Sequence, residues 1–215
     1  VMALVSDDQT KGIVIRLSCE TDFVAKNESF VDLTKRFAEV VLANMPETMD
    51  DLLALPFDDI TIGEKVSEQT GVIGEKIEIS SYEKIEAPLV APYIHMGYRA
   101  GVLIGLSKDA AGAFDAGRDV AMQVAAMRPI AVDKDGVDQT TVAKEIEIGK
   151  EQARQEGKPE AMLEKIAMGK LQKFFKESTL LNQDYVKDNK MSVAQYLKSI
   201  DKDLTVTAFR HVELG

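Results

Sequence analysis

The chain has 215 residues, of which 45% are hydrophobic and 29% charged, which is enough to bury a core in one or two domains. Its net charge of −10, without any block of lysine and arginine, argues against direct binding to nucleic acid. The apolar runs are too short to cross a bilayer and the single cysteine cannot form an internal disulfide, so we expect a soluble cytoplasmic protein with no membrane partner.

Two short segments of the chain resemble each other, GIVIRLS at residues 12–18 and GVLIGLS at residues 101–107. Each follows a polar turn that itself follows another apolar stretch, which is the pattern of strand, tight turn and strand. An amphipathic helix is expected after each hairpin, from about Ser29, with Asp32 at capping-box-like spacing, and from about Ala113. The pattern predicts a structural repeat, although so short a match also has chance as an alternative explanation.

Further elements separate the two hairpins. A short helix is expected at residues 50–55, a longer one at 60–73, and a strand at 75–86 with a polar break at Ser80-Ser81. The fold class that follows is α+β, with two related units of antiparallel sheet plus helices.

Residues 138–176 are rich in Lys, Glu, Gln and Ala and are interrupted once, at Gly157 and Pro159. Glycine ends helices and proline begins them, so we expect a protruding antiparallel helical hairpin of coiled-coil type. An alternative is that both helices lie flat on the core. The predicted contact stripe is thin and consists of Val142, Ile146, Ala153, Met162, Ile166, Leu171 and Phe174.

The sequence pattern of the C-terminal part predicts an amphipathic helix at 192–200 and a strand at 204–214. Three domains are expected: residues 1–86 form the first α+β unit, residues 87–137 with 177–215 form the second, and residues 138–176 form the hairpin.

The connector after the first hairpin is unusual because Phe23 stands among polar residues. Twelve residues separate Leu17 from Phe30, whereas seven separate Leu106 from Phe114 in the second copy. The second copy has no aromatic residue in that place. A connector with only a structural role would not need the insertion, so a role in binding is indicated.

The residues do not form a convincing catalytic or metal-binding constellation. The segment at 71–76 lacks the spacing of a phosphate-binding loop, and the two histidines, His95 and His211, lack metal-ligand spacing. A Cys19–His95 nucleophile pair is a remaining alternative, but a lone cysteine at a strand end is usually a core residue. The interpretation is an acidic interaction protein that is no enzyme and needs no cofactor and no metal.

The segment CETDFVAKN at residues 19–27 resembles the signature of the bacterial-type elongation factor Ts family. The resemblance covers nearly the whole chain. Further similar segments follow in order at residues 93–95, 99–103, 119–126, 156–159, 169–174, 180–186 and 192–197.

The resemblance implies a guanine-nucleotide exchange factor that acts on the GTPase elongation factor Tu. It implies that Thr21, Asp22, Phe23 and Val24 form a wedge that enters the GTPase near its bound magnesium. His95 resembles a further partner-contact position, although a hydrogen-bonded histidine at a strand end is an alternative, and Val186 is a weaker candidate of the same kind.

Two departures from the family pattern accompany the resemblance. The small N-terminal helical domain typical of the family is absent, so we expect the chain to be the core of such a factor, and glutamine replaces a frequent histidine at Gln123. A non-catalytic scaffold that acts through the helical hairpin is the alternative function. The chain is either a monomer or a homodimer.

Overall fold

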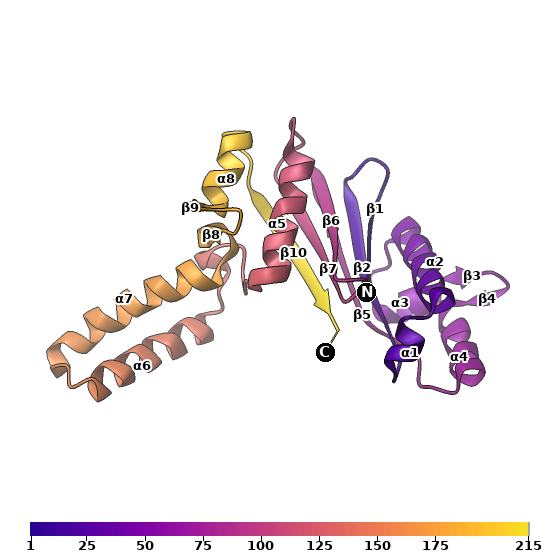
Figure 1. Cartoon of the computed structure of the whole chain (residues 1–215), viewed down its shortest axis with the longest axis horizontal. Helices are drawn as coiled ribbons and strands as arrows, with labels where there is room; N and C mark the ends of the chain where they lie inside the picture. Colours follow the sequence, from indigo (N-terminus) through magenta and orange to yellow (C-terminus); the bar gives the residue numbers. More distant parts are fainter. Residues whose placement is uncertain (215) are drawn as a thin grey trace. The chain divides into compact units, whose positions relative to one another are not determined.

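The structure is a computed structural model that describes residues 1–214. The chain divides into two compact units, one formed by Val1–Ala125 with Asp203–Gly215 and the other by Ala126–Lys202. The three-part division expected from the sequence groups the same residues differently and stays a prediction. The α+β class is confirmed by the mixture of helices and antiparallel sheets (Figure 1).

The first unit contains two three-stranded sheets with the same topology. Their strands are β1 (Met2–Val5), β2 (Lys11–Ser18) and β5 (Glu78–Glu86), and β6 (Leu89–His95), β7 (Ala100–Leu106) and β10 (Val206–Glu213). In each sheet the second strand of the hairpin is central and pairs antiparallel with both neighbours. Gly12 faces Val5 and Gly101 faces Ile94 at equivalent places in the two hairpins. The expected pairing of each repeat strand with the strand before it is therefore confirmed.

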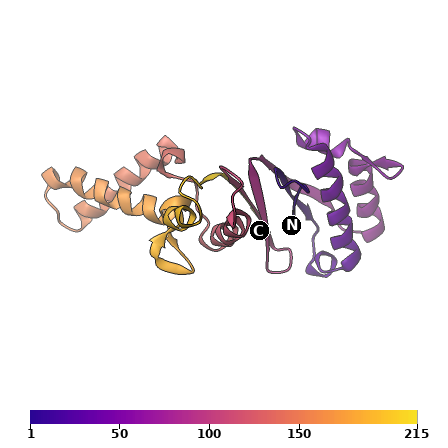
Figure 2. The ribbon, with the colours of Figure 1, turned by 90° about the horizontal axis from the view of Figure 1, so that it is seen from above.

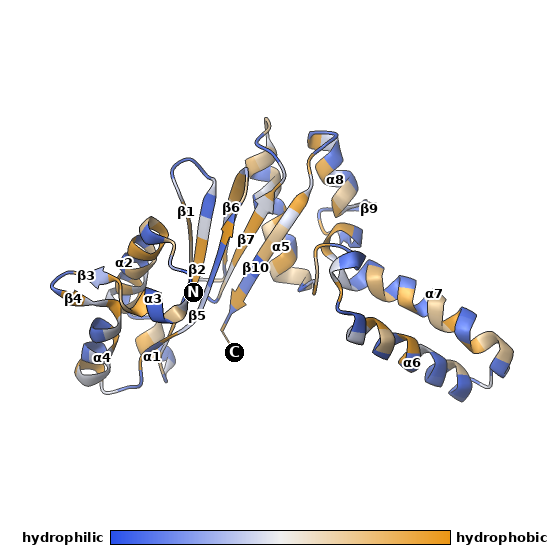
Figure 3. Ribbon diagram, turned by 180° about the vertical axis from the view of Figure 1, so that it is seen from behind, coloured by the Kyte–Doolittle hydropathy of each residue, from blue (hydrophilic) through white to orange (hydrophobic). Residues whose placement is uncertain are grey.

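Strand β2 is buried on both faces, which explains its continuous apolar sequence. Ile13 and Ile15 pack with the helices that cover the first sheet, whereas Val14 points to the second sheet. The second sheet contributes Val90 and Leu103 to the same contact. Hydrophobic segments are visible along these strands in Figure 3. The two sheets thus share one apolar layer.

Helices cover the outer faces of the two sheets (Figures 1 and 2). The first sheet carries α2 (Glu28–Asn44), α3 (Met49–Leu53) and α4 (Ile62–Ile73), together with the short hairpin β3 (Pro56–Phe57) and β4 (Ile60–Thr61). The second sheet carries α5 (Ala113–Met127). A Cβ added at Gly117 of α5 would lie 2.7 Å from the Cβ of Ala91, so this helix approaches β6 closely.

Several expected boundaries differ from the structure. The helix expected at residues 60–73 begins at Ile62, because Ile60–Thr61 form β4, and the one expected at 50–55 is Met49–Leu53. Asn27, not Ser29, caps α2, because the Asn27 side chain accepts the Ser29 amide proton at 2.9 Å and the Ser29 hydroxyl is itself a donor to Asn27. Strand β5 begins at Glu78 instead of residue 75, because the preceding residues form the turn that follows α4. The polar break at Ser80 is a bulge, where the register with β2 shifts between Arg16 and Leu17.

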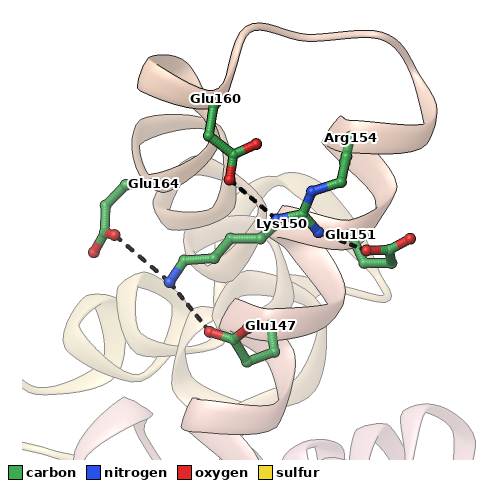
Figure 4. Close-up of polar contacts among 6 residues, drawn as sticks. All are labelled: Glu147, Lys150, Glu151, Arg154, Glu160 and Glu164. Carbon is green, nitrogen blue, oxygen red and sulfur yellow. Dashed lines mark hydrogen bonds and ion pairs between the residues drawn. The ribbon is translucent and has the colours of Figure 1, made fainter.

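The second unit contains the two long helices α6 (Gln139–Gln155) and α7 (Glu160–Ser178), which lie side by side (Figures 1 and 2). A Cβ added at Gly149 would lie 3.2 Å from the Cβ of Ala167, so the two helices approach each other closely at this pair of small residues. Two cations of α6 bridge to α7, with Lys150 3.6 Å from Glu164 and Arg154 3.2 Å from Glu160 (Figure 4). Glu147 and Glu151 of α6 contact the same two cations.

The predicted contact stripe of this hairpin is partly wrong. Leu163, Ala167 and Leu171 are the buried residues of α7, whereas Met162 is 47% exposed. The close approach at Ala167 selects the face that contains positions four residues before and after it, and Met162 lies outside that face.

The rest of the second unit consists of short elements. These are η1 (Lys134–Gly136), η2 (Leu180–Asn182), β8 (Asp184–Tyr185), β9 (Asp188–Ser192) and α8 (Val193–Ile200). Ser192 caps α8 in a capping box with Gln195. None of the helices within residues 1–214 is both long and apolar enough to span a membrane.

Candidate partner-binding site

The connector between β2 and α2 is not an irregular loop but contains a one-turn helix, α1 (Asp22–Ala25). Thr21 is its N-cap, and the backbone amides of Ala25 and Lys26 donate to the carbonyl oxygens of Thr21 and Asp22, both at 3.1 Å. Asn27 donates to the Val24 carbonyl at 3.0 Å and then caps α2. The five residues inserted relative to the second repeat are therefore folded into a defined turn.

This turn presents Phe23 to solvent. The Phe23 side chain is 89% exposed, the largest exposed fraction among the large hydrophobic residues of the described chain. Val24, the next residue, packs against the core cluster below the first sheet. Phe23 therefore lies in solvent and not in the core of its own unit, and Val24 anchors the turn that carries it.

Asp22 is also exposed and forms an ion pair with Lys26 one turn later, at 3.1 Å. The hydrogen bond from Lys26 and its positive charge lower the pKa of the Asp22 carboxyl, with a smaller contribution from Arg99. Asp22 is therefore ionised at neutral pH. The tip of the connector combines one exposed aromatic ring with one carboxylate and one ammonium group.

Glu75, which follows α4, holds the beginning of the connector. Its Oε2 accepts the backbone amide protons of Glu20 at 2.9 Å and Thr21 at 3.0 Å, and its Oε1 accepts the Thr21 hydroxyl at 2.6 Å. These hydrogen bonds lower the pKa of Glu75, the one from the Thr21 hydroxyl most strongly. Sequence reasoning missed this residue, because nothing local to Glu75 indicates a contact with residues 54 or 55 positions earlier.

A cavity of about 150 Å³ lies beside α1 in the first unit. Asp22 and Lys26 line one side, and Met96, Tyr98 and Arg99 line another. Met96 is 72% exposed and Tyr98 43% exposed. Sequence reasoning did not single out these two residues.

The turn that carries them is strained. Met96 and Tyr98 have φ values of 48° and 70°, a left-handed backbone that residues other than glycine rarely adopt. Such strain in an exposed turn is a common feature of functional surfaces. The only sequence signal for it is the polar turn around Gly97.

The structure places the two further candidates in different units. His95 ends β6 and is half-buried, and its Nδ1 lies 3.1 Å from the Tyr93 hydroxyl. It directly precedes the turn that lines the cavity beside α1. Val186 belongs to the second unit, where it lies between β8 and β9 and is 45% exposed.

The observed contacts of Cys19 weaken the alternative of a nucleophilic cysteine. Its thiol donates to the Thr21 carbonyl at 3.4 Å, and burial, together with the nearby charge of Glu75, raises the pKa of the thiol. The neutral thiol is therefore the stable form. Among residues 1–214, no cluster of three or more His, Cys, Asp or Glu residues is arranged to hold a metal ion.

Comparison with known proteins shows the family of the chain. Residues 20–215 match the protein family described as Elongation factor TS. The whole chain is 52% identical over 214 residues to Elongation factor Ts from Christiangramia forsetii and covers 77% of that protein. The chain belongs to the elongation factor Ts family.

Other members of the elongation factor Ts family are similarly close. The identity is 53% over 214 residues to the protein from Flavobacterium psychrophilum, again with 100% of this chain and 77% of the relative covered. It is 42% over 211 residues to the protein from Hydrogenobaculum, with coverages of 96% and 75%. The resemblance found in the sequence is confirmed, and the protein is a translation elongation factor of the elongation factor Ts family.

Proposed function

We propose that this protein is a guanine-nucleotide exchange factor for elongation factor Tu and that Phe23 is the central element of its wedge. The observation that carries the proposal is the position of Phe23, which is 89% exposed on an ordered turn. An isolated aromatic side chain in water loses the free energy that burial would supply. Aromatic residues that enter a partner's pocket are frequent sources of binding energy.

The residues around Phe23 have complementary roles in this proposal. Thr21 begins the turn, Val24 anchors it on the core, and Asp22 competes for polar groups in the partner. Insertion of Phe23 displaces elements of the GTPase that hold its magnesium ion. Because Mg²⁺ requires nearly ideal octahedral coordination, a small displacement of these elements weakens the binding of the ion. Binding of the GDP phosphates, which the ion supports, is then weakened as well.

Exchange of this kind does not change a covalent bond in a substrate, so the protein does not act as an enzyme in the usual sense. The coupling between factor and nucleotide is reciprocal, since a factor that lowers nucleotide affinity is itself released when nucleotide binds. His95 and Val186 are proposed as additional contacts to the GTPase. No nucleic acid is required for the reaction.

The experiment uses elongation factor Tu loaded with a fluorescent GDP analogue. Addition of the chain with excess unlabelled GDP is expected to accelerate release of the analogue in proportion to the concentration of the chain, until saturation. High GDP is expected to dissociate the complex of the two proteins. Release at the intrinsic rate at every concentration of the chain would overturn the proposal.

A further inference from the structure

We infer that Glu75 is the positioning residue of the wedge, which holds residues 20–24 in the conformation that presents Phe23. The inference rests on the proposed exchange function and adds a residue to it. Glu75 contacts the wedge at Thr21, the residue that begins it. It acts through Thr21.

The first argument is that α1 is too short to be stable by itself. It has four residues, whereas isolated helices in water need about 12–15 residues even with favourable sequences. Contacts from outside the turn must therefore order it. Phe23 supplies none of them, because it is 89% exposed.

The second argument is the geometry of the Glu75 contacts. The Glu75 carboxylate accepts three hydrogen bonds, from the Glu20 amide at 2.9 Å, the Thr21 amide at 3.0 Å and the Thr21 hydroxyl at 2.6 Å. Hydrogen bonds to an ionised acceptor are roughly twice as strong as neutral ones. These hydrogen bonds fix the backbone at the N-cap of α1. The orientation of the N-cap in turn determines the direction in which α1 and Phe23 extend.

The third argument is that Glu75 is itself held in place. The Gly74 amide donates to the Thr70 carbonyl at 3.0 Å, and the Ile77 amide donates to the Thr70 hydroxyl at 3.1 Å. The residues on both sides of Glu75 are therefore tied to the last turn of α4. A negative charge beyond the C-terminus of a helix gains nothing from the dipole of that helix, so the stability of α4 does not explain a carboxylate here.

The test compares Glu75→Ala with wild-type protein in two backgrounds, one with Phe23 and one with Phe23→Ala. With Phe23 present, Glu75→Ala should slow nucleotide exchange about 5- to 30-fold, which is the cost of ordering roughly one residue, 1–2 kcal/mol, at tenfold per 1.4 kcal/mol. In the Phe23→Ala background the same change should have less than about a twofold effect, since no anchor remains to be positioned.

Two further variants complete the design. Glu68→Ala removes an equal charge from α4, where Glu68 forms an ion pair with Lys65 at 2.8 Å, and should leave exchange unchanged. Glu75→Gln keeps an acceptor oxygen without the charge and should give an intermediate rate. If Glu75→Ala does not fold, Glu75→Gln carries the comparison in both backgrounds.

Amide hydrogen exchange provides a readout that is independent of the partner. In Glu75→Ala the amides of Glu20 and Thr21 should exchange faster, whereas those of β2 should not change. Unchanged protection of Glu20 and Thr21, or equal losses of nucleotide exchange in both Phe23 backgrounds, would overturn the positioning role. Failure of the unmodified chain to accelerate GDP release would overturn the proposed function instead.

Discussion

Phe23 and Leu33 are apolar residues only ten positions apart, yet their environments are opposite. Phe23 is 89% exposed, whereas Leu33 of α2 is 8% exposed and belongs to the core below the first sheet. Burial of Phe23 is therefore available only to a complex, and burial of Leu33 already stabilises the free protein. This contrast allows binding and stability to be separated by single substitutions.

Phe23→Ala is expected to leave the melting temperature of the free protein nearly unchanged, because no core contact is lost. If Phe23 is a buried anchor in the complex, its truncation costs about 2–4 kcal/mol, or about 30- to 800-fold in the exchange rate. Fluorescent GDP release and thermal unfolding measure the two quantities.

Leu33→Ala is the matched control for Phe23→Ala. It should lower stability by about 2–5 kcal/mol and leave exchange per folded molecule close to normal. The reverse pattern, in which Phe23→Ala lowers the melting temperature and keeps full exchange activity, would show that Phe23 is an ordinary core residue.

Tyr82 of β5 gives a prediction about pH. Its hydroxyl donates to the Pro46 carbonyl at 2.9 Å, and burial, with smaller effects of Glu47 and Glu86, raises the pKa of Tyr82 to about 12. The folded state thus keeps a proton that the unfolded chain loses near pH 10. This contribution to stability is complete below about pH 10 and is lost as the pH rises toward 12.

The measurement for Tyr82 is an absorbance titration of phenolate formation. The difference between wild-type protein and Tyr82→Phe should titrate with a midpoint near pH 12. In addition, Tyr82→Phe should remove part of the loss of stability between pH 10 and 12. A midpoint near pH 10 would mean that the ring is open to water.

At the scale of elements, replacement of glycine by alanine should have opposite effects on stability at two helical positions, Gly117 and Gly169. A Cβ at Gly117 of α5 would lie 2.7 Å from the Cβ of Ala91, an atom that moves only with the backbone of β6. A Cβ at Gly169 of α7 would have nothing within 4 Å. Alanine is the better helix former at both positions, so steric contact decides the sign.

Gly117→Ala should therefore lower the free energy of unfolding by about 1–3 kcal/mol, since α5 must move away from the sheet. Gly169→Ala should raise it by about 0.5–1 kcal/mol. Denaturant titrations of the two variants check both values. A stabilised Gly117→Ala protein would contradict the close packing of α5 on β6.

At the scale of the whole molecule, the helical hairpin offers a test between the exchange function and the scaffold alternative. The proposed wedge and His95 belong to the first unit, and Val186 lies in the second unit outside residues 140–174. The first unit has two core clusters, one on each face of β2, that contain no residue of the hairpin. Its fold should therefore survive removal of the hairpin.

Deletion of residues 140–174, with a short flexible linker in their place, should keep exchange within about twofold of wild type, as expected for independent sites. The assay is again release of fluorescent GDP. A deletion variant that folds, keeps its wedge and yet loses the function of the protein would favour the scaffold alternative.

The local sequence determined the elements whose signals are local. Alternation of apolar residues and polar turns predicted both hairpins, and the pair Gly157 and Pro159 predicted the break between α6 and α7. The family was also recognisable from the segment at residues 19–27. These features depend on residues that are neighbours in the chain, so periodicity and turn chemistry are sufficient to find them.

Only the tertiary structure decided the features that depend on distant residues. The one-turn helix α1 forms where Glu75 reaches Thr21, 54 positions away. The approach of Ala167 to Gly149 determined the inward face of α7, and the packing of the two sheets brought Val14 and Leu103 into one apolar cluster. Such contacts depend on how whole elements pack in three dimensions. The sequence near one residue therefore does not indicate which distant residue it will contact.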